Sequence, residues 1–179
     1  MRAKSEKFGI KADNVFIIGS SAGGHLAALA GITNGHEVLE GKVGDYRSES
    51  SAIQGIVSLY GASNLTTILN QSTPHGLSVR VPALDLFIGG QPDDLVDETR
   101  LASPVFHVDA NDPPLLMIHG DQDPQMPINQ SHELEGRYES VGAPVIFEAL
   151  HGAKHGGAMF YDAERMDRIH RFLSRVIGG

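Results

Sequence analysis

A run of four apolar residues at positions 15–18 leads directly into a Gly-Ser-Ser-Ala-Gly motif at positions 19–23, and a helix-prone stretch of small residues follows. A serine between glycines at such a junction is typical of a strand, a sharp turn and a helix in direct succession. Because glycine has no Cβ atom, Gly19 and Gly23 are predicted to let the strand and the helix approach each other closely. The motif therefore predicts an α/β fold that holds a serine at the end of a strand.

Three further strand-like runs follow, at residues 53–60, 115–118 and 145–147. Apolar residues fill most of their positions, which is typical of strands covered on both faces, and the segments between them have helical periodicity. This alternation predicts a mostly parallel sheet flanked by helices, in a single domain over residues 1–179. The proline-rich segment 61–114 is less regular, and we expect it to pass over the substrate side of the sheet.

Helix boundaries can be placed from local signals. We expect an N-terminal helix to end at Gly9, where left-handed backbone is free of strain, and a helix over residues 129–141 to end at Gly142. The last helix is predicted to begin at Asp162, whose carboxylate can accept from free backbone N–H groups. Its inward-facing positions are expected to be Met166, Ile169, Leu173 and Val176.

Charge and composition exclude several classes of function. Fourteen Lys and Arg against 22 Asp and Glu give a net charge of −8, which would repel a nucleic-acid backbone. No apolar run approaches the ~20 residues of a membrane span, and the N-terminus lacks the apolar core of a signal peptide. We therefore expect no nucleic-acid partner and no membrane span. A cytoplasmic location is the default for this chain, and the location of a longer, exported parent protein is left open.

Metal and thiol chemistry are also disfavoured. The chain has no cysteine, so thiolate metal sites and a thiol nucleophile are excluded. Its histidines and carboxylates do not show metal-ligand spacing, and no cofactor is expected. His25, in the helix after the serine motif, and His119, at a strand end, are expected to be structural histidines.

Ser21 is the predicted nucleophile. At the carboxyl end of its strand it faces the positive end of the following helix, where the backbone N–H of Ala22 can donate to a developing oxyanion. Ser20 is the competing serine, but its position in the motif should point its side chain elsewhere. A serine hydroxyl is a poor nucleophile unless a base takes its proton and a carboxylate orients that base. The chain must therefore supply a histidine and an acid.

The acid and the base are predicted to be Asp123 and His155. They follow the third and fourth predicted strands, and the carboxyl ends of parallel strands share one edge of a sheet with Ser21. Asp121 and His151 lie in the same two loops. They stay open as the alternative acid and the alternative base. A glycine pair after His155 permits a tight loop that approaches the serine, which favours His155 over His151.

The motif and its surroundings, residues 19–27, are similar to the nucleophile turn of bacterial acetyl, feruloyl and related carboxylesterases. These enzymes belong to the α/β-hydrolase superfamily and are akin to its hormone-sensitive-lipase-like group. Residues 102–105 and 113–124 resemble the stretch that runs before and through their catalytic acid, which falls on Asp123. The resemblance extends from about residue 7 to the C-terminus. It implies hydrolysis of a small-molecule ester through an acyl-enzyme, with no cofactor.

Two departures from this family bear on activity. Lys154 replaces the small residue usual before the catalytic histidine, which the resemblance places on His155. The family also carries strands and a His-Gly-Gly-Gly-like oxyanion motif ahead of its serine, whereas the His-Gly-Gly of this chain is at residues 155–157. The expected fold is therefore a truncated α/β-hydrolase. Ala22 alone would leave its oxyanion hole incomplete, and one lost donor typically lowers the rate about 10²- to 10³-fold.

Two other functions stay open, and the incomplete oxyanion hole is the reason for the first of them. The chain could be a weak or inactive remnant that acts as a binding module, or an oligopeptidase-like hydrolase, although the residues after Ser21 favour an esterase. The strand at residues 15–18 would also form an exposed apolar edge of the sheet. We therefore expect the chain to self-associate through this edge as a homo-oligomer.

Overall fold

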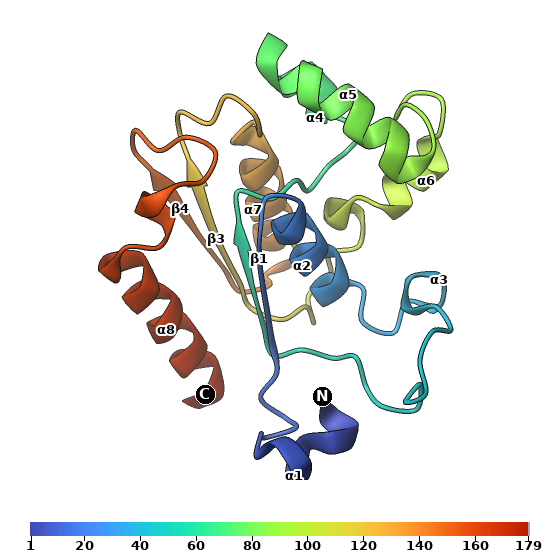
Figure 1. Ribbon diagram of the computed structural model, residues 1–179, viewed down its shortest axis with the longest axis vertical. Helices are drawn as coiled ribbons and strands as arrows, with labels where there is room; N and C mark the ends of the chain where they lie inside the picture. Colours follow the sequence, from blue (N-terminus) through green and yellow to red (C-terminus); the bar gives the residue numbers. More distant parts are fainter. Residues whose placement is uncertain (179) are drawn as a thin grey trace.

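The computed structural model describes residues 1–178, and Figure 1 shows their sheet with helices on both sides. Four parallel strands lie in the order β1-β2-β3-β4. Their bounds are β1 Phe16–Ser20, β2 Gly55–Leu59, β3 Leu115–Gly120 and β4 Val145–Leu150. The predicted α/β fold with a mostly parallel sheet is confirmed. Each strand overlaps its predicted run, and three of the four extend beyond it at the carboxyl end.

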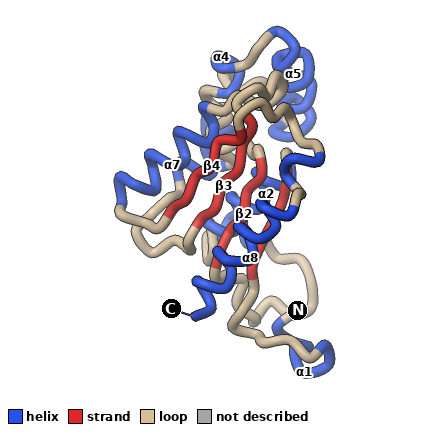
Figure 2. Tube along the Cα trace, turned by 90° about the vertical axis from the view of Figure 1, so that its left-hand side faces the viewer, coloured by secondary structure: helices blue, strands red, loops and turns tan. Residues whose placement is uncertain are grey.

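Helices cover both faces of the sheet. Helices α2 (Ala22–Ile32) and α7 (Asn129–Val141) lie on one face, and α8 (Ala163–Gly178) lies on the other (Figures 1 and 2). Alternate residues of the strands divide between the two sides, because successive side chains of a strand point to opposite faces. Leu115 packs with α2 and α7, whereas Leu116 packs with α8. The two central strands, β2 and β3, are thus buried on both faces, as their apolar residues require.

The helix ends follow the predicted signals, whereas one prediction about the inner face of the last helix is wrong. Gly9 ends α1 (Ser5–Phe8) with a φ of 63°, and Gly142 ends α7 with a φ of 74°. Asp162 caps α8, since its carboxylate accepts from the N–H of Arg165 at 2.9 Å. The prediction that Met166 faces inward is wrong, because its side chain is 48% exposed.

The buried stripe of α8 begins one turn later than predicted. Ile169 and Phe172 are buried, and Leu173 and Val176 pack against the same cluster. These residues stand at positions i, i+3, i+4 and i+7, so a single face of the helix contacts the sheet. The large Phe172 ring, rather than Met166, completes this contact.

The segment between β2 and β3 lies beyond the carboxyl ends of the strands (Figure 1). Its elements are α4 (Ile68–Gln71), α5 (Pro74–Ile88), α6 (Val96–Leu101) and η2 (Pro104–Phe106). The buried side chain of Gln130 in α7 anchors its start, since Oε1 accepts from the N–H groups of Ser63 and Asn64 at 2.9 and 2.8 Å. Leu65, Ile68 and Leu84 of this segment form a buried cluster with Met126. The segment therefore builds one wall around the ends of the strands.

Three short elements remain. They are η1 (Arg2–Lys4), α3 (Glu37–Glu40) and η3 (Ala158–Phe160). Strand β1 is an edge of the sheet, and the Ile18 side chain on it is 55% exposed. Self-association through this edge stays a prediction. None of the helices in the described part of the chain combines the length and apolarity needed to cross a bilayer.

Asp112, just before β3, makes stability depend on pH. Burial raises the pKa of Asp112 from 3.8 to about 6. The hydrogen bond from the Asp109 N–H lowers this pKa, but burial has the larger effect. The folded chain holds this proton more tightly than the unfolded chain, so stability falls as pH rises from about 3.8 to about 6. We expect Asp112→Asn to raise the free energy of unfolding at pH 7 by about 1 kcal/mol, a figure lowered for solvent screening.

Urea unfolding of wild type and Asp112→Asn at pH 3.5 and pH 7 measures this effect. The gain is expected at pH 7 and should nearly vanish at pH 3.5, where the wild-type carboxyl is protonated in the folded state and mostly protonated in the unfolded state. Equal midpoints of the two proteins at pH 7 would contradict the prediction.

Candidate active site

Ser21 occupies the sharp turn between β1 and α2. Its φ of 54° and ψ of −121° lie in a region that non-glycine residues rarely adopt. A Cβ atom on Gly19 would stand 2.1 Å from the carbonyl oxygen of Gly23, so the turn closes only with glycine at position 19. The requirement predicted for Gly23 is wrong, because a Cβ built there would meet no atom within 4 Å beyond its chain neighbours and the backbone of its own helix. The second close approach is at Gly24, where a Cβ would stand 2.8 Å from the Leu59 oxygen.

Three predicted residues meet at this turn. Ser21 Oγ lies 2.8 Å from His155 Nε2, and His155 Nδ1 lies 2.7 Å from Asp123 Oδ2. A carboxylate oxygen accepts, so Nδ1 donates its hydrogen to Asp123. In the neutral ring Nε2 then carries the lone pair, and the Ser21 hydroxyl donates to it. The arrangement can move a proton from the serine to the histidine.

The Asp123 carboxylate is fully enclosed and hydrogen-bonded at both oxygens. Oδ1 accepts from the backbone N–H groups of Gln125 and Met126, each at 2.8 Å. Burial alone would raise the pKa of Asp123. Hydrogen bonds from His119, from His155 and from the two backbone groups outweigh burial and hold this pKa well below its usual range. The group therefore stays ionised and can orient the His155 ring.

His119 also lies against Asp123 Oδ2, a contact that the sequence analysis did not predict. Its ring is buried, with Nε2 3.1 Å from the Met126 oxygen and 3.3 Å from Asp123 Oδ2. Nδ1 lies 2.8 Å from Ser131 Oγ. As expected of a structural histidine, both nitrogens are satisfied, but one of them also supports Asp123. The Leu-Met-Ile-His run before the acid could have signalled this contact, since it ends at the same edge of the sheet.

The pairing of β3 with β4 brings the acid and base loops together. Gly120 is opposite Leu150 in the parallel register, and the Gln122 N–H donates to the Ala153 oxygen at 3.0 Å. A Cβ on Gly120 would stand 2.2 Å from that same oxygen, so glycine permits the loops to pack. The two loops are therefore held side by side although about 30 residues separate them.

Asp121 and His151 form a separate pair on the surface. His151 Nδ1 lies 2.8 Å from Asp121 Oδ2, and the His151 side chain is 96% exposed. Asp121 Oδ1 also accepts from the Gly152 N–H at 2.7 Å, and the pKa of Asp121 is lowered by this bond and by His151. The pair closes the turn after β4, and neither residue contacts Ser21.

Tyr60 is a further site residue that sequence reasoning missed. It directly follows β2, has a φ of 41°, and places its ring edge-to-face against His155 with centroids 4.9 Å apart. Its hydroxyl lies 3.2 Å from that of Tyr161, and burial is the main cause that raises the pKa of Tyr60. A bulky residue at positive φ is unusual, and its place at the end of a buried strand was the available signal.

The first turn of α2 presents free N–H groups beside Ser21. Ala22 is the first residue of the helix, so its N–H has no partner within the helix. The Ser21 N–H is engaged, since it donates to the Leu59 oxygen at 2.9 Å. His25 lies one turn along, buried, with Nε2 2.8 Å from the Ala102 oxygen. No cluster of three or more metal-binding side chains occurs in residues 1–178.

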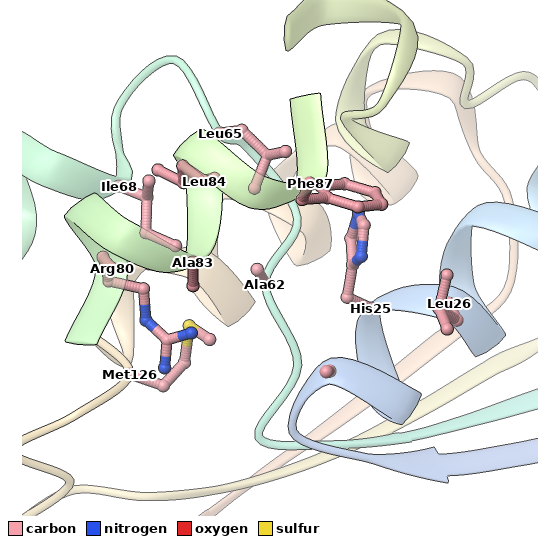
Figure 3. A pocket seen from close by; sticks show the side chains of 11 residues that line it. His25, Leu26, Ala62, Leu65, Ile68, Arg80, Ala83, Leu84, Phe87 and Met126 are labelled. Atoms are coloured by element: carbon pink, nitrogen blue, oxygen red, sulfur yellow. The ribbon is translucent and has the colours of Figure 1, made fainter. Parts of the chain in front are cut away.

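A pocket of about 220 Å³ opens next to Ala22 (Figure 3). Its walls come from α2, α5, the chain after β2 and the acid loop. The lining residues are Ala22, His25, Leu26, Ala62, Leu65, Ile68, Arg80, Ala83, Leu84, Phe87 and Met126. The pocket thus lies between the predicted oxyanion donor and the loop that carries Asp123.

Known esterases are among the proteins to which this chain is similar. Esterase LipC of Mycobacterium tuberculosis is 30% identical over 182 residues, which cover 95% of this chain and 44% of LipC. The probable carboxylic ester hydrolase LipM of the same organism is 28% identical, with coverage of 98% and 40%. The chain therefore spans less than half the length of these curated relatives.

A solved structure, described as a truncated form of carbohydrate esterase from gut microbiota, is also similar. It has a TM-score of 0.89 and 30% identity, and the match covers 99% of this chain and 65% of that one. The family model BD-FAE matches residues 1–138, more than three quarters of the sequence. The chain therefore belongs to the BD-FAE family and has the fold of the α/β-hydrolase esterases.

Proposed function

We propose that this chain hydrolyses carboxylic esters by two-step acyl transfer, with Ser21 as nucleophile, His155 as base and Asp123 as acid. The observation that carries the proposal is the continuous contact from Ser21 Oγ to His155 Nε2 at 2.8 Å and from His155 Nδ1 to Asp123 at 2.7 Å. The strained turn at Ser21 supports it, because such strain is retained where it exposes a reacting group.

In the first step His155 takes the Ser21 proton while Oγ attacks the ester carbonyl. Negative charge then develops on the carbonyl oxygen, and the Ala22 N–H is the proposed donor to it. His155 returns the proton to the departing alcohol, and an acyl-enzyme remains. Water repeats the attack on this intermediate, which releases the carboxylic acid and restores Ser21.

Covalent labelling tests the proposal directly. A fluorophosphonate should add to the protein in a one-to-one ratio, and peptide mass spectrometry should place it on Ser21. Hydrolysis of p-nitrophenyl acetate should be lost in step with labelling. A protein that is folded yet neither labels nor hydrolyses the ester would favour a binding module.

A further inference from the structure

The pocket beside Ala22 is lined almost wholly by apolar side chains. His25 and Arg80 are its polar exceptions. Burial is the main cause that lowers the pKa of His25, and its Nε2 is already bound to a backbone carbonyl. His25 is therefore expected to be neutral near pH 7, and Arg80 is the cation of the pocket.

The Arg80 guanidinium has little to bind in the folded chain. Its Nε is buried without a hydrogen-bond partner, and Nη2 reaches the Gln125 oxygen only at 3.5 Å. Within residues 1–178, no carboxylate oxygen lies within 4.0 Å of its nitrogens. An arginine that is partly desolvated and lacks a counter-ion costs free energy unless a ligand supplies one.

A purely structural role fits Arg80 poorly. Asp123 is near enough for its charge to act on Arg80, yet both of its oxygens are already hydrogen-bonded to the protein. Figure 3 shows the guanidinium beside Met126, away from His25 and Leu26 at the other end of the pocket. Arg80 therefore presents its donors at the end of the pocket nearest Met126 and the loop that carries Asp123.

We infer that this pocket binds one arm of the ester substrate and that Arg80 receives a carboxylate at the end of that arm. The inference rests on the proposed ester hydrolysis and names a substrate class for it. A guanidinium forms paired N–H bonds with a carboxylate, and these are stronger in a poorly hydrated site. The pocket volume of about 220 Å³ is below the ~300 to 1,000 Å³ of typical small-molecule sites, so the arm is short.

Matched esters test the inference on either side of the ester bond. Comparing monoethyl succinate with ethyl butyrate tests the acyl arm, and the rate is measured from the ethanol released. Comparing the acetate ester of 4-hydroxybutanoate with butyl acetate tests the alcohol arm, and the rate is measured from the acetate released. In at least one of the two pairs, the kcat/KM of wild type should be about 10- to 100-fold higher for the ester that carries a carboxylate than for its neutral counterpart. Arg80→Gln should abolish this preference by raising KM for the carboxylate ester about 10- to 100-fold more than KM for the neutral ester.

Two control variants sharpen the test. Arg80→Lys keeps the positive charge but lacks the paired N–H donors of the guanidinium, so it should retain part of the preference. Arg171→Gln removes the same charge from an exposed position on α8 and should retain all of it. Wild type that prefers neither carboxylate, or an unchanged preference in Arg80→Gln, would overturn the inference.

Failure of the proposed function gives a different result. If wild type hydrolyses neither ester of either pair, calorimetry with monoethyl succinate and with the acetate ester of 4-hydroxybutanoate still tests the pocket in the Ser21→Ala variant. At least one compound should bind, and adding Arg80→Gln should weaken that binding by about 10-fold or more. Absence of binding of both would refute the carboxylate site.

Discussion

Ser21→Ala is expected to lower kcat for p-nitrophenyl acetate by about 10⁴- to 10⁶-fold, with little change in melting temperature. The substitution removes the oxygen that lies 2.8 Å from His155 Nε2, so no acyl-enzyme can form. The backbone N–H of Ala22 and the pocket remain, and they leave only the residual rate that binding and oxyanion stabilisation support. Steady-state hydrolysis, with active-site titration of wild type, measures the loss.

Ser20→Ala is the matched control. Ser20 is the last residue of β1 and lies in the same motif, but the serine oxygen hydrogen-bonded to His155 Nε2 is that of Ser21. We expect its kcat to stay within about 5-fold of wild type, since a lost hydrogen bond outside the reacting groups costs ~1 kcal/mol or less. Activity above one tenth of wild type in Ser21→Ala would show that another group is the nucleophile.

Asp123→Asn is expected to lower kcat by about 10⁴-fold. An amide that keeps its oxygen on the Gln125 and Met126 N–H groups turns its NH₂ toward His155. His155 Nδ1 would then have to accept, which places its hydrogen on Nε2 and removes the lone pair that faces Ser21. The NH₂ also faces the His119 donor, so we expect a loss of about 1–3 kcal/mol in the free energy of unfolding.

Asp121→Asn tests the same chemistry on the neighbouring carboxylate. The new amide oxygen can still accept from the Gly152 N–H, and the pair with His151 is exposed. We expect kcat within about 2-fold of wild type, as for most surface substitutions. Parallel kinetics and urea unfolding of the two variants compare the carboxylates. Similar losses of kcat in both would show that Asp123 is not the specific acid.

The turn at Ser21 was predictable because its causes are local. The apolar run, the glycine before the serine and the small residues after it act on neighbours only a few positions away. The ends of α1 and α7 at Gly9 and Gly142 were predictable for the same reason, since one left-handed residue ends each helix. Patterns of this range also sufficed for the parallel α/β fold.

Close packing between elements was harder to predict. The sequence placed Gly19 and Gly23 on an equal footing, whereas the fold needs glycine at positions 19 and 24. It likewise chose Met166 for the inner face of α8, where Phe172 packs instead. Both errors concern how one element is rotated against another, which depends on neighbours that are distant in sequence.

The sequence by itself determined the strand-turn-helix unit that holds Ser21, and two short loops that each offer two candidates for the predicted acid or base. Only the tertiary structure decided which member of each loop connects to Ser21. The register of β3 against β4 aligns the loops so that Asp123 and His155 face inward, while Asp121 and His151 pair at the surface. The physical reason is that local preferences act over a few residues, whereas hydrogen bonds between distant loops form only once the sheet has assembled.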